Sequence, residues 1–188
     1  MSIATRKDQA RDRARALRAG LSANANDFVR YWPGMEPSAI IAGYWPINSE
    51  VDIRPLLQRL SESHTIVLPV TPRDRLRLSF RRWTPDAAME AGPFGTQHPV
   101  GELSDGADPL VPDVVLVPLL AFTRQGDRLG YGGGYYDATL AGLKTEKPSL
   151  RTVGVAYAGQ MVKVLPTEKT DMQLDHILTE NGLITTHV

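Results

Sequence analysis

The feature that most constrains this chain is the stretch from Pro118 to Leu140, which carries a cluster of glycines between two regular segments. The run 113–117 leads into it without a helical period, as is typical of a strand buried on both faces, and residues 138–141 favour a helix. The segment between them holds five of the chain's 16 glycines: Gly126, Gly130, Gly132, Gly133 and Gly134. This order of strand, glycine-rich loop and helix predicts a parallel α/β sheet.

The glycine-rich loop has the chemistry of a phosphate site. Consecutive glycines let backbone N–H groups wrap an anion, and a helix that begins near Tyr135 adds its positive end. Arg128 can clamp phosphate oxygens in a bidentate manner, and Asp137 can hold a magnesium ion beside them. The loop lacks the Gly-Lys-Ser/Thr ending of a P-loop, and Tyr135 replaces the third glycine of a dinucleotide fingerprint. A tight connection that binds nothing is the alternative.

The string RLGYGGGYYD (128–137), preceded by VPLLAF (117–122), resembles the signature of the 5-formyltetrahydrofolate cyclo-ligase family. The resemblance implies an enzyme that uses ATP and Mg²⁺, with the loop contacting both ATP and the folate. The implied ATP contacts in the loop are Arg128, Leu129, Gly130, Tyr131, Gly132, Gly133, Gly134, Tyr135 and Tyr136. The implied folate contacts in the loop are Tyr131, Gly132, Gly133, Gly134 and Tyr135.

Residues 4–21 are predicted to form an amphipathic helix with Lys7, Arg11 and Arg18 along the edge of its apolar stripe. One interpretation is a solvated basic face, partly neutralised by neighbouring aspartates. The other is that Lys7 and Arg11, one turn apart, reach phosphates held by the loop. The resemblance implies the second, because the family places a Lys-x-x-x-Arg pair in its ATP site. Lys7, Arg11 and Arg128 are therefore the candidate catalytic residues.

A second strand, loop and helix begins at residues 39–44 and continues through Trp45 and Glu50 to a helix that ends near residue 61. Glu50 could serve only as a first-turn acid, and Trp45 only as a lid on the core. The resemblance instead assigns both residues to the folate pocket. A carboxylate suits the paired N–H donors of a pterin, and an indole can stack on its flat ring.

The segment 167–176 carries Glu168 and Asp171 ahead of a predicted last strand at 177–179. Loop acids of this kind are commonly turn formers or caps. The resemblance implies that Asp171 joins Asp137 at the magnesium ion, with water and phosphate completing the shell. Two positions depart from the family pattern, because His98 and Thr123 stand where relatives usually carry acids.

Further buried or half-buried strands are predicted at 65–70, 76–83 and 151–157. Alternating strands and helices with several apolar strands predict a three-layer α/β/α fold with a mostly parallel sheet. The resemblance narrows this to the fold shared by the ribose-phosphate isomerases and CoA-transferases. We expect one domain over residues 1–188, since two independent cores would be cramped in 188 residues.

Composition excludes several other classes of function. Lys+Arg and Asp+Glu both number 21, so no net charge recruits nucleic acid or an anionic membrane. The chain has no cysteine, which excludes a thiolate metal site and a cysteine nucleophile. No apolar run is long enough to cross a membrane, and the basic N-terminus lacks the apolar region of an export signal. We therefore expect a cytoplasmic monomer that binds small molecules only.

The resemblance implies ATP-dependent cyclisation of 5-formyltetrahydrofolate to 5,10-methenyltetrahydrofolate through phosphorylation of the formyl oxygen, with release of ADP and phosphate. Two alternatives stay open. The first is a relative that binds nucleotide or folate without catalysis, favoured by His98 and Thr123. The second is an enzyme of the same fold that acts on a sugar phosphate or an acyl-CoA without ATP, which leaves Lys7, Arg11 and Glu50 unexplained.

Overall fold

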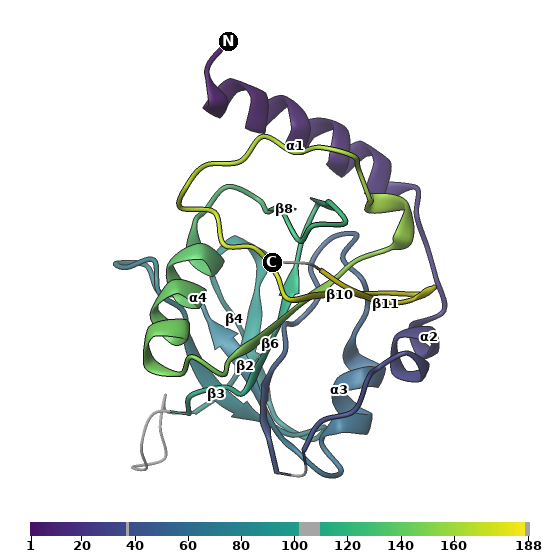
Figure 1. Cartoon of the computed structure of the whole chain (residues 1–188). Coiled ribbons are helices and arrows are strands. Elements are labelled where there is room, and N and C mark those ends of the chain that lie inside the picture. The colour runs from purple at the N-terminus through teal and green to yellow at the C-terminus, as the bar shows by residue number, and fades with distance from the viewer. Residues whose placement is uncertain (37, 102–109, 187–188) are drawn as a thin grey trace.

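The computed structural model describes residues 1–36, 38–101 and 110–186, and its centre is a seven-stranded sheet (Figure 1). The strand order is β11-β10-β9-β6-β1-β2-β3. The inner strands β10, β9, β6, β1 and β2 are parallel, and the two edge strands are antiparallel to their neighbours. The strand bounds are β1 Ile40–Ala42, β2 Thr65–Val70, β3 Ser79–Trp83, β6 Val114–Pro118, β9 Arg151–Val155, β10 His176–Thr179 and β11 Gly182–Thr185.

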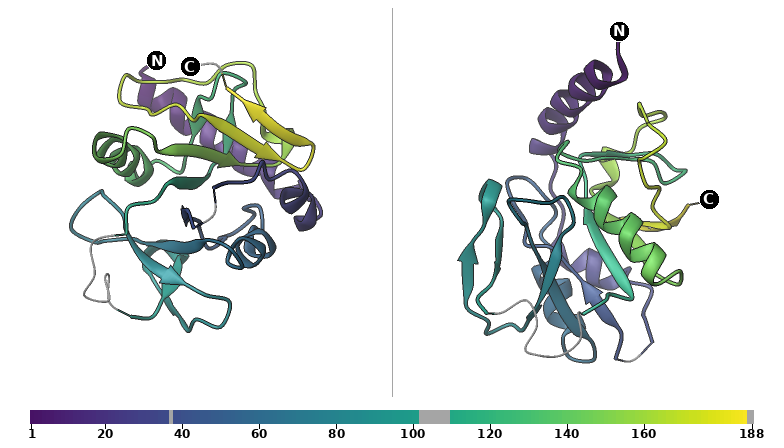
Figure 2. Two further views of the ribbon diagram at one scale, coloured as in Figure 1. Left: turned by 60° about the horizontal axis from the view of Figure 1, so that its bottom comes forward. Right: turned by 90° about the vertical axis from the view of Figure 1, so that its left-hand side faces the viewer.

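Helices cover both faces of this sheet (Figure 2). On one face, α4 (Tyr135–Glu146) packs its Leu140 and Leu143 against Val115 and Val117 of β6. On the other face, α2 (Ala25–Arg30) and α3 (Arg54–Leu60) enclose a second apolar core around the alternate side chains of the same strands. Strands with apolar residues on both faces need cover on both faces. The prediction of a three-layer fold with a mostly parallel sheet is thus confirmed.

The helix α1 (Ile3–Ala19) lies beyond the carboxyl end of β6, at the top of Figure 1. Ser2 caps it by accepting a hydrogen bond from the Thr5 amide. Its Ala14 packs on Leu120 and Leu129, which belong to a short hairpin region formed by β7 (Ala121–Phe122) and β8 (Arg128–Leu129). The first helix therefore closes over the edge of the sheet where a parallel α/β fold binds its ligands.

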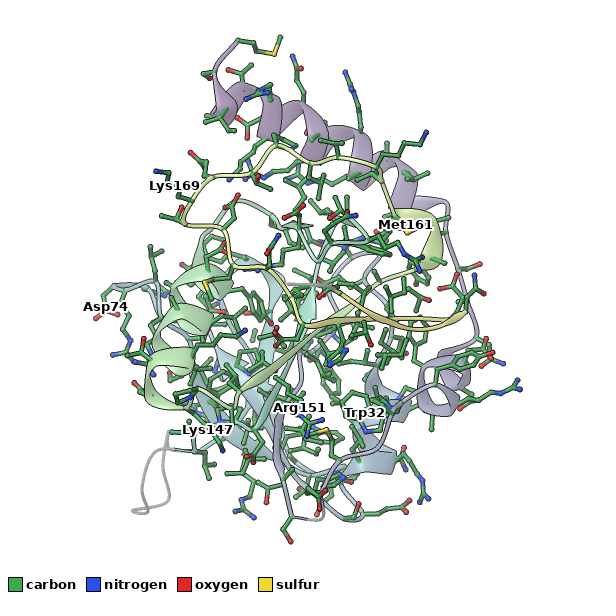
Figure 3. All side chains as sticks on the ribbon, viewed as in Figure 1. Trp32, Asp74, Lys147, Arg151, Met161 and Lys169 are labelled. Atoms are coloured by element: carbon green, nitrogen blue, oxygen red, sulfur yellow. The ribbon has the colours of Figure 1, made fainter. Side chains whose placement is uncertain are left out.

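The remaining regular elements lie outside these layers. A separate two-stranded sheet joins β4 (Met89–Ala91) to β5 (Gln97–Pro99) around the 3₁₀ turn η1 (Pro93–Gly95). A second 3₁₀ turn, η2 (Ala158–Gln160), follows β9. The segment after it runs beneath α1, between Met161 and Lys169 in Figure 3. The predicted loop at 101–112 falls largely outside the described residues.

Three local predictions were wrong. The hairpin of β7 and β8 separates β6 from the glycine-rich loop, so the strand does not lead into the loop directly. The strand at 176–179 is not the last, because β11 pairs with it as an antiparallel edge. The sequence also offers Ser22 as the cap of a second short helix through Val29, but this helix begins at Ala25 with Asn24 as its cap. The segment 161–166, for which the sequence predicts a short amphipathic piece, forms an isolated bridge between Met161 and Phe122 and packs Val162 and Leu165 inward.

Candidate active site

The glycine-rich loop connects β8 to α4 and needs glycine at particular positions. Gly132 has φ 99° and Gly134, the N-cap of α4, has φ 72°, a region that L-residues with side chains avoid. A Cβ added at Gly132 would also lie 3.0 Å from the Arg11 guanidinium carbon. Since Gly134 carries no capping side chain, the first-turn amides of α4 open onto the loop. This geometry suits an anion, as the sequence predicted.

Lys7 of α1 is held by two acids of the segment beneath the helix. Its Nζ donates to Asp171 Oδ1 and Oδ2 at 2.9 and 2.7 Å and to Glu168 Oε2 at 2.7 Å. Burial lowers the pKa of this ammonium, but the hydrogen bonds to Asp171 and Glu168 outweigh it and raise the pKa. Lys7 is therefore a buried cation, 8% exposed, and the interpretation as a solvated basic face is wrong for it.

Arg11, one turn later, joins α1 to the loop itself. Its Nε donates to the Gly130 carbonyl at 3.1 Å, and its Nη1 pairs with Asp8 at 2.6 Å. Arg18 departs furthest from the sequence interpretation, because it is only 2% exposed. Placing it at the solvent edge of the helix was wrong.

Arg128 is also buried and fixes the start of α4. Its Nη2 donates to Asp137 Oδ1 at 2.6 Å, and its Nη1 donates to the Met172 carbonyl. The Met172 amide in turn donates to Asp137 Oδ1 at 3.0 Å. Burial lowers the pKa of Arg128, although the charge of Asp137 opposes the shift. A cavity of about 320 Å³ adjoins this cluster and is lined by Asp127, Arg128, Lys144, Thr167, Glu168, Asp171, Met172 and Gln173.

The carboxylates of this cluster are the candidate ligands of the expected magnesium ion. Asp137, Glu168 and Asp171 face the two cations Lys7 and Arg128, which leaves one negative charge in excess. Carboxylate oxygens are the ligands that Mg²⁺ prefers, and it retains water and phosphate in most sites. Within residues 1–36, 38–101 and 110–186, no group of three or more His, Asp or Glu could hold an ion unaided. Asp137 and Asp171 thus have the ligand chemistry that Mg²⁺ prefers, but the described residues do not form a complete metal site.

Glu50 lies on the folate side of the expected site and is 8% exposed. Helix α3 begins only at Arg54, so the interpretation of Glu50 as a first-turn acid is wrong. Burial raises the pKa of this carboxyl to about 7, although the Ile47 amide, the charge of Arg18 and the Tyr131 hydroxyl act in the opposite direction. Near neutral pH, Glu50 is poised between its neutral and ionised forms.

The aromatic candidates differ in their surroundings. Tyr131 is partly buried near Glu50, and burial and that carboxylate raise its pKa. Tyr135 pairs with exposed Phe94 at a ring distance of 6.2 Å. Tyr136, in the first turn of α4, packs on the core, where burial and the charge of Glu50 raise its pKa. Trp45 packs on the core and pairs with a second indole at 6.4 Å, as expected of a core lid, so pterin stacking stays a prediction.

Three further positions have local explanations in the structure. The side chain of Leu129 is buried beneath α1, so only its backbone can meet a ligand. Thr123 donates to Asp127 Oδ2 at 3.0 Å and closes the hairpin turn. His98 Nε2 lies 3.1 Å from Glu90 Oε1 in the β4-β5 sheet. Thr123 is thus satisfied by its neighbour, whereas His98 is paired only through Nε2, and its buried Nδ1 has no hydrogen-bond partner among the described residues.

The sequence alone did not assign two residues of this region to the site. Glu168 was interpreted only as a loop acid. It lies three residues before Asp171, and both carboxylates accept hydrogen bonds from Lys7. Arg18 follows Lys7 and Arg11 along the same side of α1, and that periodicity was the available signal. Its burial depends on neighbours that are distant in sequence.

The fold and the site together are those of an α/β protein suited to an anionic ligand at the carboxyl edge of a parallel sheet. Residues 5–180 match the profile of the 5-formyltetrahydrofolate cyclo-ligase family. The chain belongs to this family. Among the residues that the structure describes, no helix combines the length and apolarity needed to span a membrane.

Individual relatives support the assignment. A 5-formyltetrahydrofolate cyclo-ligase of Haemophilus influenzae is 36% identical over 140 residues, which cover 73% of this chain and 74% of that protein. Its Escherichia coli K12 counterpart is 30% identical over 79% of this chain and 81% of that protein. The solution structure of Aquifex aeolicus 5,10-methenyltetrahydrofolate synthetase superimposes with a TM-score of 0.74 and 26% identity, over 97% of this chain and 93% of that one.

Proposed function

We propose that this protein catalyses the ATP-dependent cyclisation of 5-formyltetrahydrofolate to 5,10-methenyltetrahydrofolate, with release of ADP and phosphate. The observation that carries the proposal is the meeting of three segments at one edge of the sheet. The glycine-rich loop, the cationic side of α1 and the buried Glu50 are brought together there. The relatives that share most of the chain are named for this reaction.

The reaction needs a leaving group, because the amide-like formyl carbon does not lose its oxygen as hydroxide. In the proposed sequence, the formyl oxygen attacks the γ-phosphorus and ADP leaves. The neighbouring amine nitrogen then attacks the formyl carbon, its proton is lost, and the oxygen departs with the phosphate. Positioning and charge neutralisation supply most of the catalysis in such transfers.

The residues take their roles from this sequence of steps. Lys7, Arg11 and Arg128 draw charge off the γ-phosphate, and the loop amides from Gly130 to Tyr136 hold the phosphate chain. Tyr131 to Tyr135 place the formyl oxygen against the phosphate. Glu50 accepts the paired N–H donors of the pterin, and Trp45 stacks on its ring.

Asp137 and Asp171 would hold Mg²⁺ together with the phosphates, where the ion would neutralise charge on the transferred group. Lys7 and Arg128 now pair with these acids and would turn to the incoming phosphates. Asp137→Asn and Asp171→Asn should therefore raise the Mg²⁺ concentration needed for half-maximal rate. Asp12→Asn, at an exposed acid of α1, is the matched control.

The direct test follows the near-ultraviolet absorbance of methenyltetrahydrofolate when the protein is mixed with 5-formyltetrahydrofolate, ATP and Mg²⁺. We expect a rise that disappears when any one of the three is left out. No rise, with ATP or folate still bound in calorimetry, would favour a non-catalytic binding relative. A rise that does not need ATP would refute the proposed mechanism.

Three broader expectations belong to the same proposal. We propose a single domain over residues 1–188, a monomer, and residence in the cytoplasm with small-molecule partners only. Size-exclusion chromatography with light scattering checks the oligomeric state, and limited proteolysis checks for a second folding unit.

A further inference from the structure

Arg18 is a buried arginine that the phosphate site leaves unexplained. It lies near the end of α1, is 2% exposed, and reaches three segments that are distant in sequence. Its Nε donates to Ser49 Oγ at 3.1 Å, and its Nη1 donates to the Leu119 carbonyl at 3.0 Å. Its Nη2 donates to the hydroxyl of Tyr131, whose ring also lies 5.3 Å from the guanidinium carbon.

Packing alone does not account for an arginine at this position. Burying a guanidinium is costly unless it is paired and hydrogen-bonded, and an aliphatic side chain would fill the space more cheaply. Within the described ranges, Arg18 has no carboxylate within 4.0 Å, in contrast to Lys7 and Arg128. Its hydrogen bonds instead go to neutral oxygens, and its charge lowers the pKa of Glu50.

The hydrogen-bond directions in this cluster are fixed by chemistry. Arginine can only donate, so the Tyr131 oxygen accepts from Arg18 and its own proton must point elsewhere. Glu50 lies near this hydroxyl, and each of the two groups shifts the pKa of the other. Arg18 thus links α1 to the glycine-rich loop through Tyr131, and to the segment before α3 through Ser49, the neighbour of Glu50.

We propose that Arg18 is a positioning residue for the cyclisation: it orients Tyr131 and Glu50 and thereby fixes the nucleotide-binding loop relative to the folate-binding segment. The inference rests on the proposed function. Arg18 itself touches neither substrate, because it acts from beneath the loop through Tyr131. Misplacing the two substrates by even about 1 Å can cost about 100-fold in rate, which is why such a link matters.

The test is a double-mutant cycle with Arg18→Lys and Tyr131→Phe, read as kcat and KM for each substrate. Lysine keeps the charge but cannot reach three acceptors in a fixed fork. We expect each single variant to lose about tenfold in kcat/KM for 5-formyltetrahydrofolate, as for one lost charge-assisted hydrogen bond, and the double variant to lose no more than either. Arg15→Lys, at an exposed arginine of the same helix, is the control and should match wild type.

Effects of Arg18→Lys and Tyr131→Phe that multiply would overturn the proposal, as would an Arg18→Lys variant with wild-type kinetics. If Arg18→Lys fails to fold, Ser49→Ala is used instead, because it removes one hydrogen bond of the Arg18 guanidinium. Ser49→Ala should then lower kcat/KM for 5-formyltetrahydrofolate by a smaller factor. An unchanged kcat/KM in this variant would overturn the proposal. Failure of the proposed function shows separately, as a wild type that makes no product. In that case, NMR of ¹³C-labelled tyrosine tests whether Arg18 orients Tyr131. The Tyr131 signal must change in Arg18→Lys and not in Arg15→Lys.

Discussion

Replacing Glu50 by glutamine should make the protein more stable at alkaline pH and less active. Glu50 is 8% exposed, and the Ile47 amide donates a hydrogen bond to its Oε2 at 2.9 Å. Glutamine keeps the shape and keeps an oxygen for that amide, but it never carries a charge. The substitution therefore isolates the cost of holding an ionised carboxylate in a buried site.

The size of the effect follows from the pKa. Burial raises the folded-state pKa from 4.5 to about 7. Below pH 4.5 the Glu50 carboxyl is protonated in both the folded and the unfolded state, so it does not change the free energy of unfolding. Between these values the unfolded chain binds fewer protons than the folded one, so the free energy of unfolding falls as pH rises. Above about pH 7 the loss of unfolding free energy is complete. A pKa shift of this size corresponds to a loss of about 3 kcal/mol.

Urea denaturation of the wild type and of Glu50→Gln at pH 4.5, 6 and 8 measures the difference in unfolding free energy. We expect the two proteins to be nearly equal at pH 4.5 and the variant to be more stable by about 2 to 3 kcal/mol at pH 8. The kcat/KM for 5-formyltetrahydrofolate should fall at least about tenfold at pH 8, because the amide cannot accept two hydrogen bonds from the pterin edge. Glu36→Gln, at an exposed glutamate, is the control.

A difference in stability that stays constant across this pH range would refute the reasoning, since it would mean that Glu50 ionises alike in both states. A variant that loses stability as pH rises would refute it more strongly. A stabilised variant with full activity would keep the burial argument but remove Glu50 from the folate pocket.

Three further substitutions probe the phosphate side of the site. Lys7→Met should raise the KM for ATP at least about tenfold in steady-state kinetics, and an unchanged KM would remove Lys7 from that site. Arg128→Ala should weaken ATP binding in calorimetry and cost about 1 to 2 kcal/mol in urea denaturation, because Asp137 and the Met172 carbonyl both lose the buried guanidinium as donor; full stability would contradict this role of Arg128. Gly132→Ala should lower ATP affinity about tenfold, since it combines positive φ with contact against Arg11. Gly34→Ala is the control, because it introduces the same backbone strain without a close contact. An equal loss of ATP affinity in this variant would refute the role of the contact between residue 132 and Arg11.

Much of the fold could be predicted because its strands carry strong local signals. The runs that became β2, β6 and β9 are apolar on both faces, and only a sheet covered on both sides accommodates them. The missed elements have weak local signals. The strands of the β7-β8 hairpin are two residues each, and β11 pairs only along one edge. Such short strands form because their partners are already in place.

The parallel α/β class, the glycine-rich loop, the positions of Lys7 and Arg11 on one helix and the likeness to a folate enzyme family could all be predicted from the chain alone. These features follow from periodicity and from short motifs, which depend on neighbours along the chain. Which groups are buried became clear only from the folded structure. It placed Arg18 under the loop, and it withdrew Glu50 from water. Burial and charge pairing depend on contacts between distant segments, so their energies appear only when the chain is folded.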